Sequence, residues 1–91
     1  MITEKFACPC CGYKTFEEEL KGQYDICEIC FWEDDPIQVI NPDYSGGANK
    51  VSLRQAQINF MEFGACEKEM LKNVRRPNVE DKRGENWKPL E

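Results

Sequence analysis

Four cysteines in two C-x-x-C pairs constrain the fold of this chain most strongly. Cys8 and Cys11 form the first pair, Cys27 and Cys30 form the second, and fifteen residues lie between the pairs. Each pair lets one tight turn present two sulfur atoms to the same ion, and the segment between them is long enough for a hairpin that returns the second turn to the first. The chain has no histidine that would compete as a ligand. The spacing therefore predicts a closed four-thiolate metal site.

The ligand type narrows the identity of the ion. Thiolate sulfur is soft, so four sulfurs suit zinc or iron far better than magnesium or calcium. We predict one structural zinc ion, because four protein thiolates leave no open position for a catalytic water. Iron is the alternative, since Cys11, Gly12 and Tyr13 also resemble half of a rubredoxin site. Phe31 follows the second pair where glycine follows the first, which predicts different exit geometries for the two turns.

The length and the amino terminus limit the class of protein. A chain of 91 residues predicts a single domain over 1–91, short enough for a metal to add appreciably to its stability. The amino terminus lacks the apolar core of a secretory signal and the longest apolar runs are a few residues, so we expect a cytoplasmic protein without a membrane span. Three disulfides in a secreted miniprotein would use the same six cysteines, but a reducing compartment and the adjacent Cys10 and Cys11 argue against them.

The charge of the chain bears on its partners. Its formal net charge is -5, and four thiolates with one divalent ion would make it more acidic still. Such a chain repels phosphate backbones, so we expect a protein partner, with a basic one the easier match, and no nucleic acid. The basic residues near the carboxyl end are interleaved with acidic ones, as in an ordinary solvated surface. They are Lys72, Arg75, Arg76, Lys82, Arg83 and Lys88.

The amino-terminal half predicts short strands. Residues 13–18 and 24–26 flank a turn signal at 21–23, and Ile37, Val39 and Ile40 are typical of a third strand. We therefore expect a zinc-ribbon-like unit over residues 5–40, with a β-hairpin or three-stranded sheet around the ion. Turn residues predict a loop over 41–51.

The carboxyl-terminal half predicts helices. Ser52 is suited to cap a helix over 52–63 with Gln55 reaching back to it, and Gly64 is suited to end it. A second helix is expected over 67–75, and the tail over 77–91 carries Trp87 and Leu90, which either dock or form a partner's surface. The predicted helical stripes are Leu53, Ala56, Phe60 and Phe63, then Met70, Leu71 and Val74. The predicted class is a small α+β fold, a metal-stapled ribbon packed with one or two helices.

Two further groups of residues are candidate sites. Cys10 and Cys66 remain outside the ligand set, either as buried apolar residues or as thiols for redox chemistry or ligand exchange. Phe31 and Trp32 precede three acidic residues, Glu33, Asp34 and Asp35, and together they predict an interaction surface. The acidic run lacks the histidine, serine elbow or second motif that catalysis would need. The sequence leaves catalysis open but favours a role that is not enzymatic.

Much of the chain resembles the bacterial cysteine-rich CPCC family. The resemblance rests on the run Cys8, Pro9, Cys10, Cys11, Gly12, Tyr13 and on residues 24–27 and 30–35. It extends over residues 41–44, 46–53, 59–60 and 63–65. The resemblance implies a small zinc-ribbon-like protein and does not define a biochemical role.

Two classes of function follow. The first is a protein-binding module in which the ribbon displays Phe31, Trp32 and the acidic residues, one form being an acidic inhibitor or immunity-type protein for a basic toxin. The second is a thiol-redox or metal-transfer protein that uses Cys10 and the paired cysteines. The sequence leaves the identity of the partner and the oligomeric state open.

Overall fold

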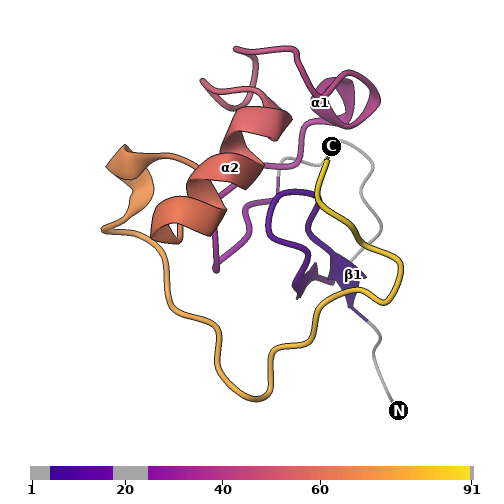
Figure 1. The fold of residues 1–91 in the computed structure, drawn as a ribbon, viewed down its shortest axis with the longest axis vertical. Coiled ribbons are helices and arrows are strands. Elements are labelled where there is room, and N and C mark those ends of the chain that lie inside the picture. Colours follow the sequence, from indigo (N-terminus) through magenta and orange to yellow (C-terminus); the bar gives the residue numbers. More distant parts are fainter. Residues whose placement is uncertain (1–4, 18–24, 91) are drawn as a thin grey trace.

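The computed structural model describes residues 5–17 and 25–90 (Figure 1). In chain order the elements are β1 (Phe6–Ala7), β2 (Lys14–Phe16), α1 (Pro36–Ile40), α2 (Leu53–Phe63) and the 3-10 helix η1 (Lys68–Met70). Turns and loops make up the rest of the described chain. A small two-stranded sheet combined with helices confirms the predicted α+β class.

The sheet surrounds the first cysteine pair. β1 and β2 run antiparallel, with Phe6 opposite Phe16 and Ala7 opposite Lys14. The predicted strand over 13–18 is therefore present as Lys14–Phe16, but it pairs with the segment before the first turn. The predicted turn at 21–23 lies outside the described residues. Of the predicted return strand, Ile26 forms an isolated bridge to Glu33.

The predicted third strand at Ile37, Val39 and Ile40 is wrong, because these residues form α1. Asp35 caps this helix: its Oδ1 accepts hydrogen bonds from the backbone N–H groups of Ile37 at 2.9 Å and Gln38 at 3.4 Å. Pro36 occupies the start of the helix, where its fixed φ and missing N–H cost nothing. Aspartate followed by proline is thus a helix-start signal that outweighs the β-branched residues after it. Within the described residues the sheet has two strands.

The helix α1 buries a polar side chain and exposes its apolar ones. Its buried residue is Gln38, whereas Ile37, Val39 and Ile40 are exposed. The Gln38 Oε1 accepts from Trp32 Nε1 and from Asn49 Nδ2, both at 3.1 Å. Its Nε2 donates to two carbonyls, those of Tyr44 at 3.0 Å and Val51 at 2.8 Å. All four hydrogen-bonding positions of this amide are used, so Gln38 ties α1 to the loop that follows it.

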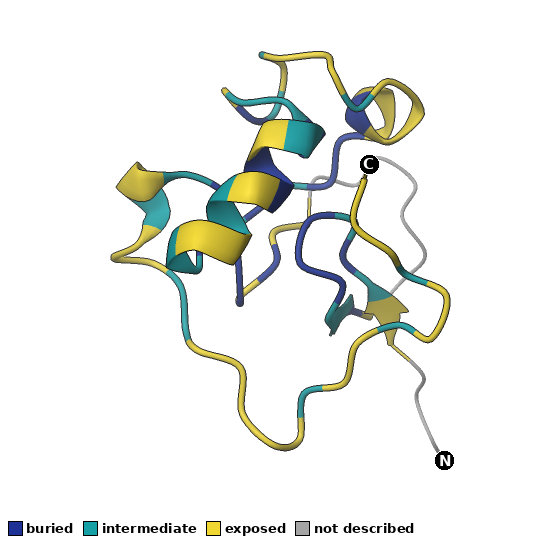
Figure 2. Ribbon diagram, in the orientation of Figure 1, coloured by how far each residue is buried: buried dark blue, intermediate teal, exposed yellow. Residues whose placement is uncertain are grey.

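The predicted helix over 52–63 is confirmed as α2. Ser52 Oγ accepts from the Gln55 N–H at 3.1 Å, and Gly64 ends the helix at a φ of 90° with its N–H on the Phe60 carbonyl. The Gln55 side chain donates to Asn59 Oδ1 at 2.8 Å, so the contact back toward Ser52 is replaced by one further along the helix. Leu53 and Ala56, from the predicted stripe, are buried, and α2 presents a buried face in Figure 2.

The second predicted helix, over 67–75, is shorter than expected. Only Lys68–Met70 is helical, as η1, and Leu71 is exposed where an inward position was predicted. Glu67 provides no side-chain cap, and the chain turns after η1 with the Asn73 N–H on the Met70 carbonyl. The chain then reaches across to the second cysteine pair, where the Arg75 N–H donates to the Glu28 carbonyl at 3.2 Å.

The tail returns to the amino-terminal half. The Lys14 N–H donates to the Lys82 carbonyl and the Gly84 N–H to the Gly12 carbonyl, both at 2.8 Å. Figure 1 shows this returning segment, in yellow, beside β1. Among the described residues, no helix is both long and apolar enough to cross a bilayer.

Replacing Gln38 with Met keeps the length of the side chain and removes its hydrogen bonds, leaving Trp32 Nε1 and two carbonyls without this partner. We expect Gln38→Met to lower the free energy of unfolding by about 3 kcal/mol, because buried polar groups lose their bonds. Urea denaturation of the metal-loaded protein measures this. The control Ile37→Met, on the exposed side of the same helix, should change it by less than about 0.5 kcal/mol. An unchanged urea midpoint in Gln38→Met would show that the hydrogen bonds of Gln38 do not stabilise the fold.

Candidate metal centre

The four paired cysteines converge in the interior. Their sulfur atoms lie within 4.8 Å of one another, and all four residues are fully buried. Cys8 Sγ lies 3.6 Å from Cys30 Sγ, and Cys11 Sγ lies 3.7 Å from Cys27 Sγ. These separations exceed the roughly 2.05 Å of a disulfide and match the edge of about 3.8 Å that Zn–S bonds of about 2.3 Å give a tetrahedron. The donor set therefore fits a tetrahedral metal ion, and iron takes the same four thiolates.

The two cysteine turns have the same backbone geometry. The Cys8 carbonyl accepts from the Gly12 N–H at 2.8 Å, and the Cys27 carbonyl accepts from the Phe31 N–H at 2.7 Å. In each turn the N–H of the first cysteine donates to the carbonyl five residues on, at 2.8 and 3.0 Å. Gly12 and Phe31 both adopt left-handed conformations, with φ of 83° and 68°. The prediction that the two exits would differ is wrong.

Phe31 adopts this conformation despite its side chain. Among the described residues, Phe31 is the one residue other than glycine with a positive φ. Such a conformation lowers the stability of the fold by about 1–3 kcal/mol. The turn holds it there because Phe31 donates to Cys27 and packs against the core. The hydrogen bonds of the C-x-x-C turn thus fix the backbone more strongly than the residue type does.

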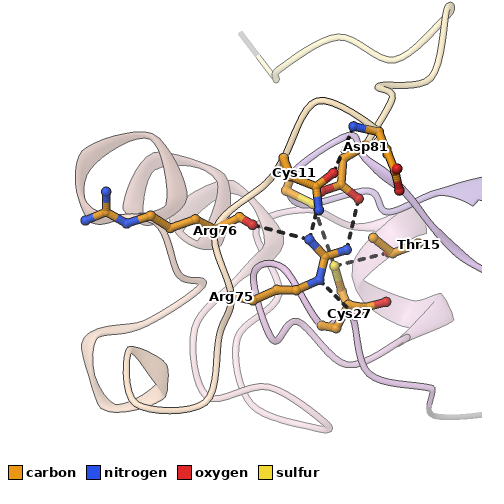
Figure 3. Close-up of polar contacts among 9 residues, drawn as sticks. Cys11, Thr15, Cys27, Arg75, Arg76 and Asp81 are labelled. Carbon is orange, nitrogen blue, oxygen red and sulfur yellow. Dashed lines mark hydrogen bonds and ion pairs between the residues drawn. The ribbon is translucent and has the colours of Figure 1, made fainter.

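Two further groups donate hydrogen bonds to the sulfur atoms. Thr15 Oγ1, on β2, lies 3.1 Å from Cys27 Sγ, and the Trp32 N–H lies 3.4 Å from Cys30 Sγ. Figure 3 shows Thr15 directed at Cys27. Both bonds favour thiolate over thiol at the sulfur that accepts them.

Four buried thiolates lying together are electrostatically unfavourable unless a cation lies between them. Burial raises the pKa of Cys8 and of Cys30, whereas the hydrogen bond from Cys11, followed by those from the other cysteines, lowers the pKa of Cys27. A bound divalent ion needs all four as thiolates, so its binding releases protons and weakens as the pH falls. Zinc or iron bound here would neutralise part of this buried charge.

Cys10 and Cys66 lie beside the cluster and are buried. Cys10 occupies the same place in the first turn as Ile29 does in the second, and both side chains are in the core. Burial, followed by the charge of Cys10, raises the pKa of Cys66 to about 12. The Cys66 N–H donates to the Cys30 carbonyl at 2.8 Å. Both cysteines thus occupy positions that suit small apolar residues.

The predicted interaction surface at residues 31–35 is largely internal. Trp32, Asp34 and Asp35 are buried, while Phe31 and Glu33 are partly exposed. Trp32 points to Gln38, and Asp35 caps α1 with one oxygen and accepts from the Ala48 N–H with the other at 3.3 Å. The prediction of an exposed aromatic and acidic edge is therefore wrong for these three side chains. Consecutive acidic residues indicated solvent exposure, but Asp34 and Asp35 are buried and the Asp35 carboxylate forms local hydrogen bonds.

Arg75 links the second cysteine turn to the tail, a role that sequence reasoning missed. Its Nε donates to Glu28 Oε2 at 2.8 Å, and its two Nη atoms donate to both oxygens of Asp81 at 2.7 and 2.9 Å (Figure 3). The Arg75 guanidinium lowers the pKa of Asp81 to about 2. Glu28 lies inside the second C-x-x-C pair, so this arginine ties a ligand turn to a residue more than fifty positions away. No local spacing in the sequence signals the contact.

The first cysteine turn is covered in a similar way. The Pro9 carbonyl accepts from Gln57 Nε2 at 2.8 Å and from Trp87 Nε1 at 3.0 Å. A Cβ atom on Gly12 would lie 2.5 Å from the Trp87 ring, so the indole packs directly on this glycine. Arg83 donates to the Cys11 carbonyl at 3.2 Å. Trp87 in the tail thus docks on the domain.

Replacing Arg75 with Gln should lower the free energy of unfolding by about 1 kcal/mol, because a bidentate pair and its link to Glu28 are lost at a partly exposed site. Urea denaturation of the metal-loaded protein measures the change. Arg76→Gln is the matched control, since it removes the same charge from a side chain that points away from the cluster in Figure 3. Equal destabilisation in both variants would show that charge, and not the link, is responsible.

The comparison with known protein families agrees with this geometry. The family model described as Cysteine-rich CPCC matches residues 6–81, which include both cysteine turns, α1, α2 and Arg75 with its partners. No curated protein matches the chain. The matched range ends before Trp87, so the docking of the indole on Gly12 lies outside it. The chain belongs to the cysteine-rich CPCC family.

Proposed function

We propose that this chain is a protein-binding domain whose fold is held by one structural zinc ion. The observation that carries the structural assignment is that all four donor sulfurs are fully buried. Catalytic zinc sites keep a position for water or substrate, and a cage of four protein thiolates provides none. The ion then acts through the backbone it organises and not through chemistry at an open coordination position.

We propose zinc rather than iron because of the type of ligands and because of the stability that zinc binding gives a small domain. A closed four-thiolate tetrahedron is a frequent structural zinc site. Zinc binds such peptides with about 10–16 kcal/mol, which equals or exceeds the total stability of about 5–15 kcal/mol of an ordinary domain. A small domain with this site depends on the metal for its fold.

The binding role is supported by the charge and by the state of the thiols. A net charge of -5 favours a basic protein partner, including the target of an acidic inhibitor or immunity-type protein. The alternative of thiol-redox or metal transfer needs an accessible thiol or a labile ion. Cys10 and Cys66 are buried, which argues against that alternative.

Metal removal tests the structural proposal. The purified protein should be colourless and hold one zinc ion per chain by elemental analysis, and excess EDTA should abolish its dispersed amide NMR spectrum until zinc is restored. Cys27→Ser should lose the ion, whereas Cys10→Ser, which leaves the four ligands intact, should retain it. A red, iron-containing protein, or one that stays folded after complete metal removal, would overturn the proposal.

Thiol reactivity tests the alternative. With its pKa raised to about 12, Cys66 is protonated at neutral pH, and burial blocks access to it. We expect iodoacetamide to modify Cys66 at least about a hundredfold more slowly in the metal-loaded protein than in urea, because the thiolate is the nucleophile. Peptide mapping by mass spectrometry measures both rates. Rapid modification of Cys66 in the folded protein would favour thiol chemistry.

A further inference from the structure

The helix α1 presents apolar side chains to solvent. The exposed fractions are 56% for Ile37, 44% for Val39 and 85% for Ile40, and Tyr44 in the following turn is 40% exposed. Ile37 and Ile40 are three residues apart, so they are neighbours on the helix surface. Figure 2 shows α1 at the edge of the molecule, mostly in the colour of exposed residues. A single exposed isoleucine is ordinary, but a cluster on one short element marks an interaction site.

The structure holds this apolar cluster rigidly. Asp35 fixes the start of α1, and Gln38 anchors its inner side through four hydrogen bonds. One of those bonds is to the Tyr44 carbonyl, so the helix and the turn that carries Tyr44 are fixed together. A pre-organised surface of this kind loses little conformational entropy when it binds.

The stretch of chain that contains α1 is acidic. Residues 25–49 contain six acidic residues and no lysine or arginine, although the whole chain has 12 basic residues. The acidic residues are Asp25, Glu28, Glu33, Asp34, Asp35 and Asp43. Two of them have arginine partners from later in the chain: Glu28 with Arg75, and Asp43 with Arg54 at 2.6 Å. Asp34 and Asp35 are buried, and the segment that carries the apolar cluster contributes no basic side chain of its own.

We propose that Ile37, Val39, Ile40 and Tyr44, the α1 surface, dock into an apolar groove of a partner protein that is rimmed by lysine or arginine. Charge complementarity selects this occupant. A second copy of the chain would bring one acidic segment against another, and an anionic lipid surface would be repelled in the same way. The inference deepens the proposed binding role and is independent of which ion fills the cysteine cage.

A synthetic amphipathic helix of leucine and lysine represents such a partner, and its leucine and glutamate counterpart is the control peptide. In amide NMR titrations of the metal-loaded full chain, the Leu/Lys peptide should shift the resonances of α1 and Tyr44, and the Leu/Glu peptide should not. Ile40→Asp should weaken binding of the Leu/Lys peptide at least about tenfold. This change adds a negative charge, which alone would strengthen attraction to a cationic peptide, so a loss reports the apolar contact.

Val79→Asp is the matched control. Val79 is 90% exposed in the tail, and the substitution makes the same change of charge and polarity away from α1. It should leave the affinity for the Leu/Lys peptide within about twofold. Because both side chains are exposed, both variants should keep the amide spectrum and the metal content of the parent protein.

The contrary outcomes separate the two proposals. Failure of the Leu/Lys peptide to bind would overturn both the α1 surface and the binding role. Binding that Ile40→Asp and Val79→Asp weaken equally would overturn the α1 surface alone. If Ile40→Asp changes the sedimentation of the free protein, the occupant of the α1 surface is a second copy of the chain, and the proposed partner is wrong. If Ile40→Asp abolishes binding to phosphatidylglycerol vesicles, the occupant is a membrane, and the proposed partner is again wrong.

Discussion

Four cysteine sulfurs converge at the centre of this fold, and the two turns that carry them organise the later parts of the chain. Each C-x-x-C turn closes on its own hydrogen bonds and leaves carbonyl groups directed outward, and later parts of the chain dock on those carbonyls. Gln57 and Trp87 donate to Pro9, and Cys66 donates to Cys30. The two turns therefore serve both as the ligand frame and as the template on which α2 and the tail assemble.

This arrangement follows from the size of the core. Of the twelve buried apolar residues in the described chain, six are cysteines, and four of those form the sulfur cluster. Burial of the remaining apolar side chains contributes less stability in so short a chain, since small domains bury a smaller fraction of their surface than large ones do. Metal coordination at the sulfur cluster would take the place of a larger hydrophobic core, and it would offset the strain of a residue such as Phe31 at the cysteine turn.

The segment after the second turn shows the same priority of specific contacts over hydrophobic pattern. Gln38 is buried and hydrogen-bonded to Trp32 and Asn49, whereas the isoleucines beside it face solvent. If hydrophobicity alone decided the orientation of α1, its isoleucines would pack against the domain. The buried amide prevents that, because rotation of α1 would leave its partners without hydrogen bonds in the interior. The polar network around Gln38 thus keeps an apolar surface exposed.

The four cysteines of the cluster and α2 could be predicted from the sequence, because C-x-x-C spacing, a serine cap and a terminal glycine act within a few residues of one another. The sequence also contained the aspartate and proline that start α1, although the β-branched residues after them favoured a strand. Three features became visible only in the folded chain: the buried side of α1, the left-handed conformation of Phe31, and the link from Glu28 through Arg75 to Asp81. These features depend on contacts between residues far apart in the chain, and no local pattern of residues encodes such contacts.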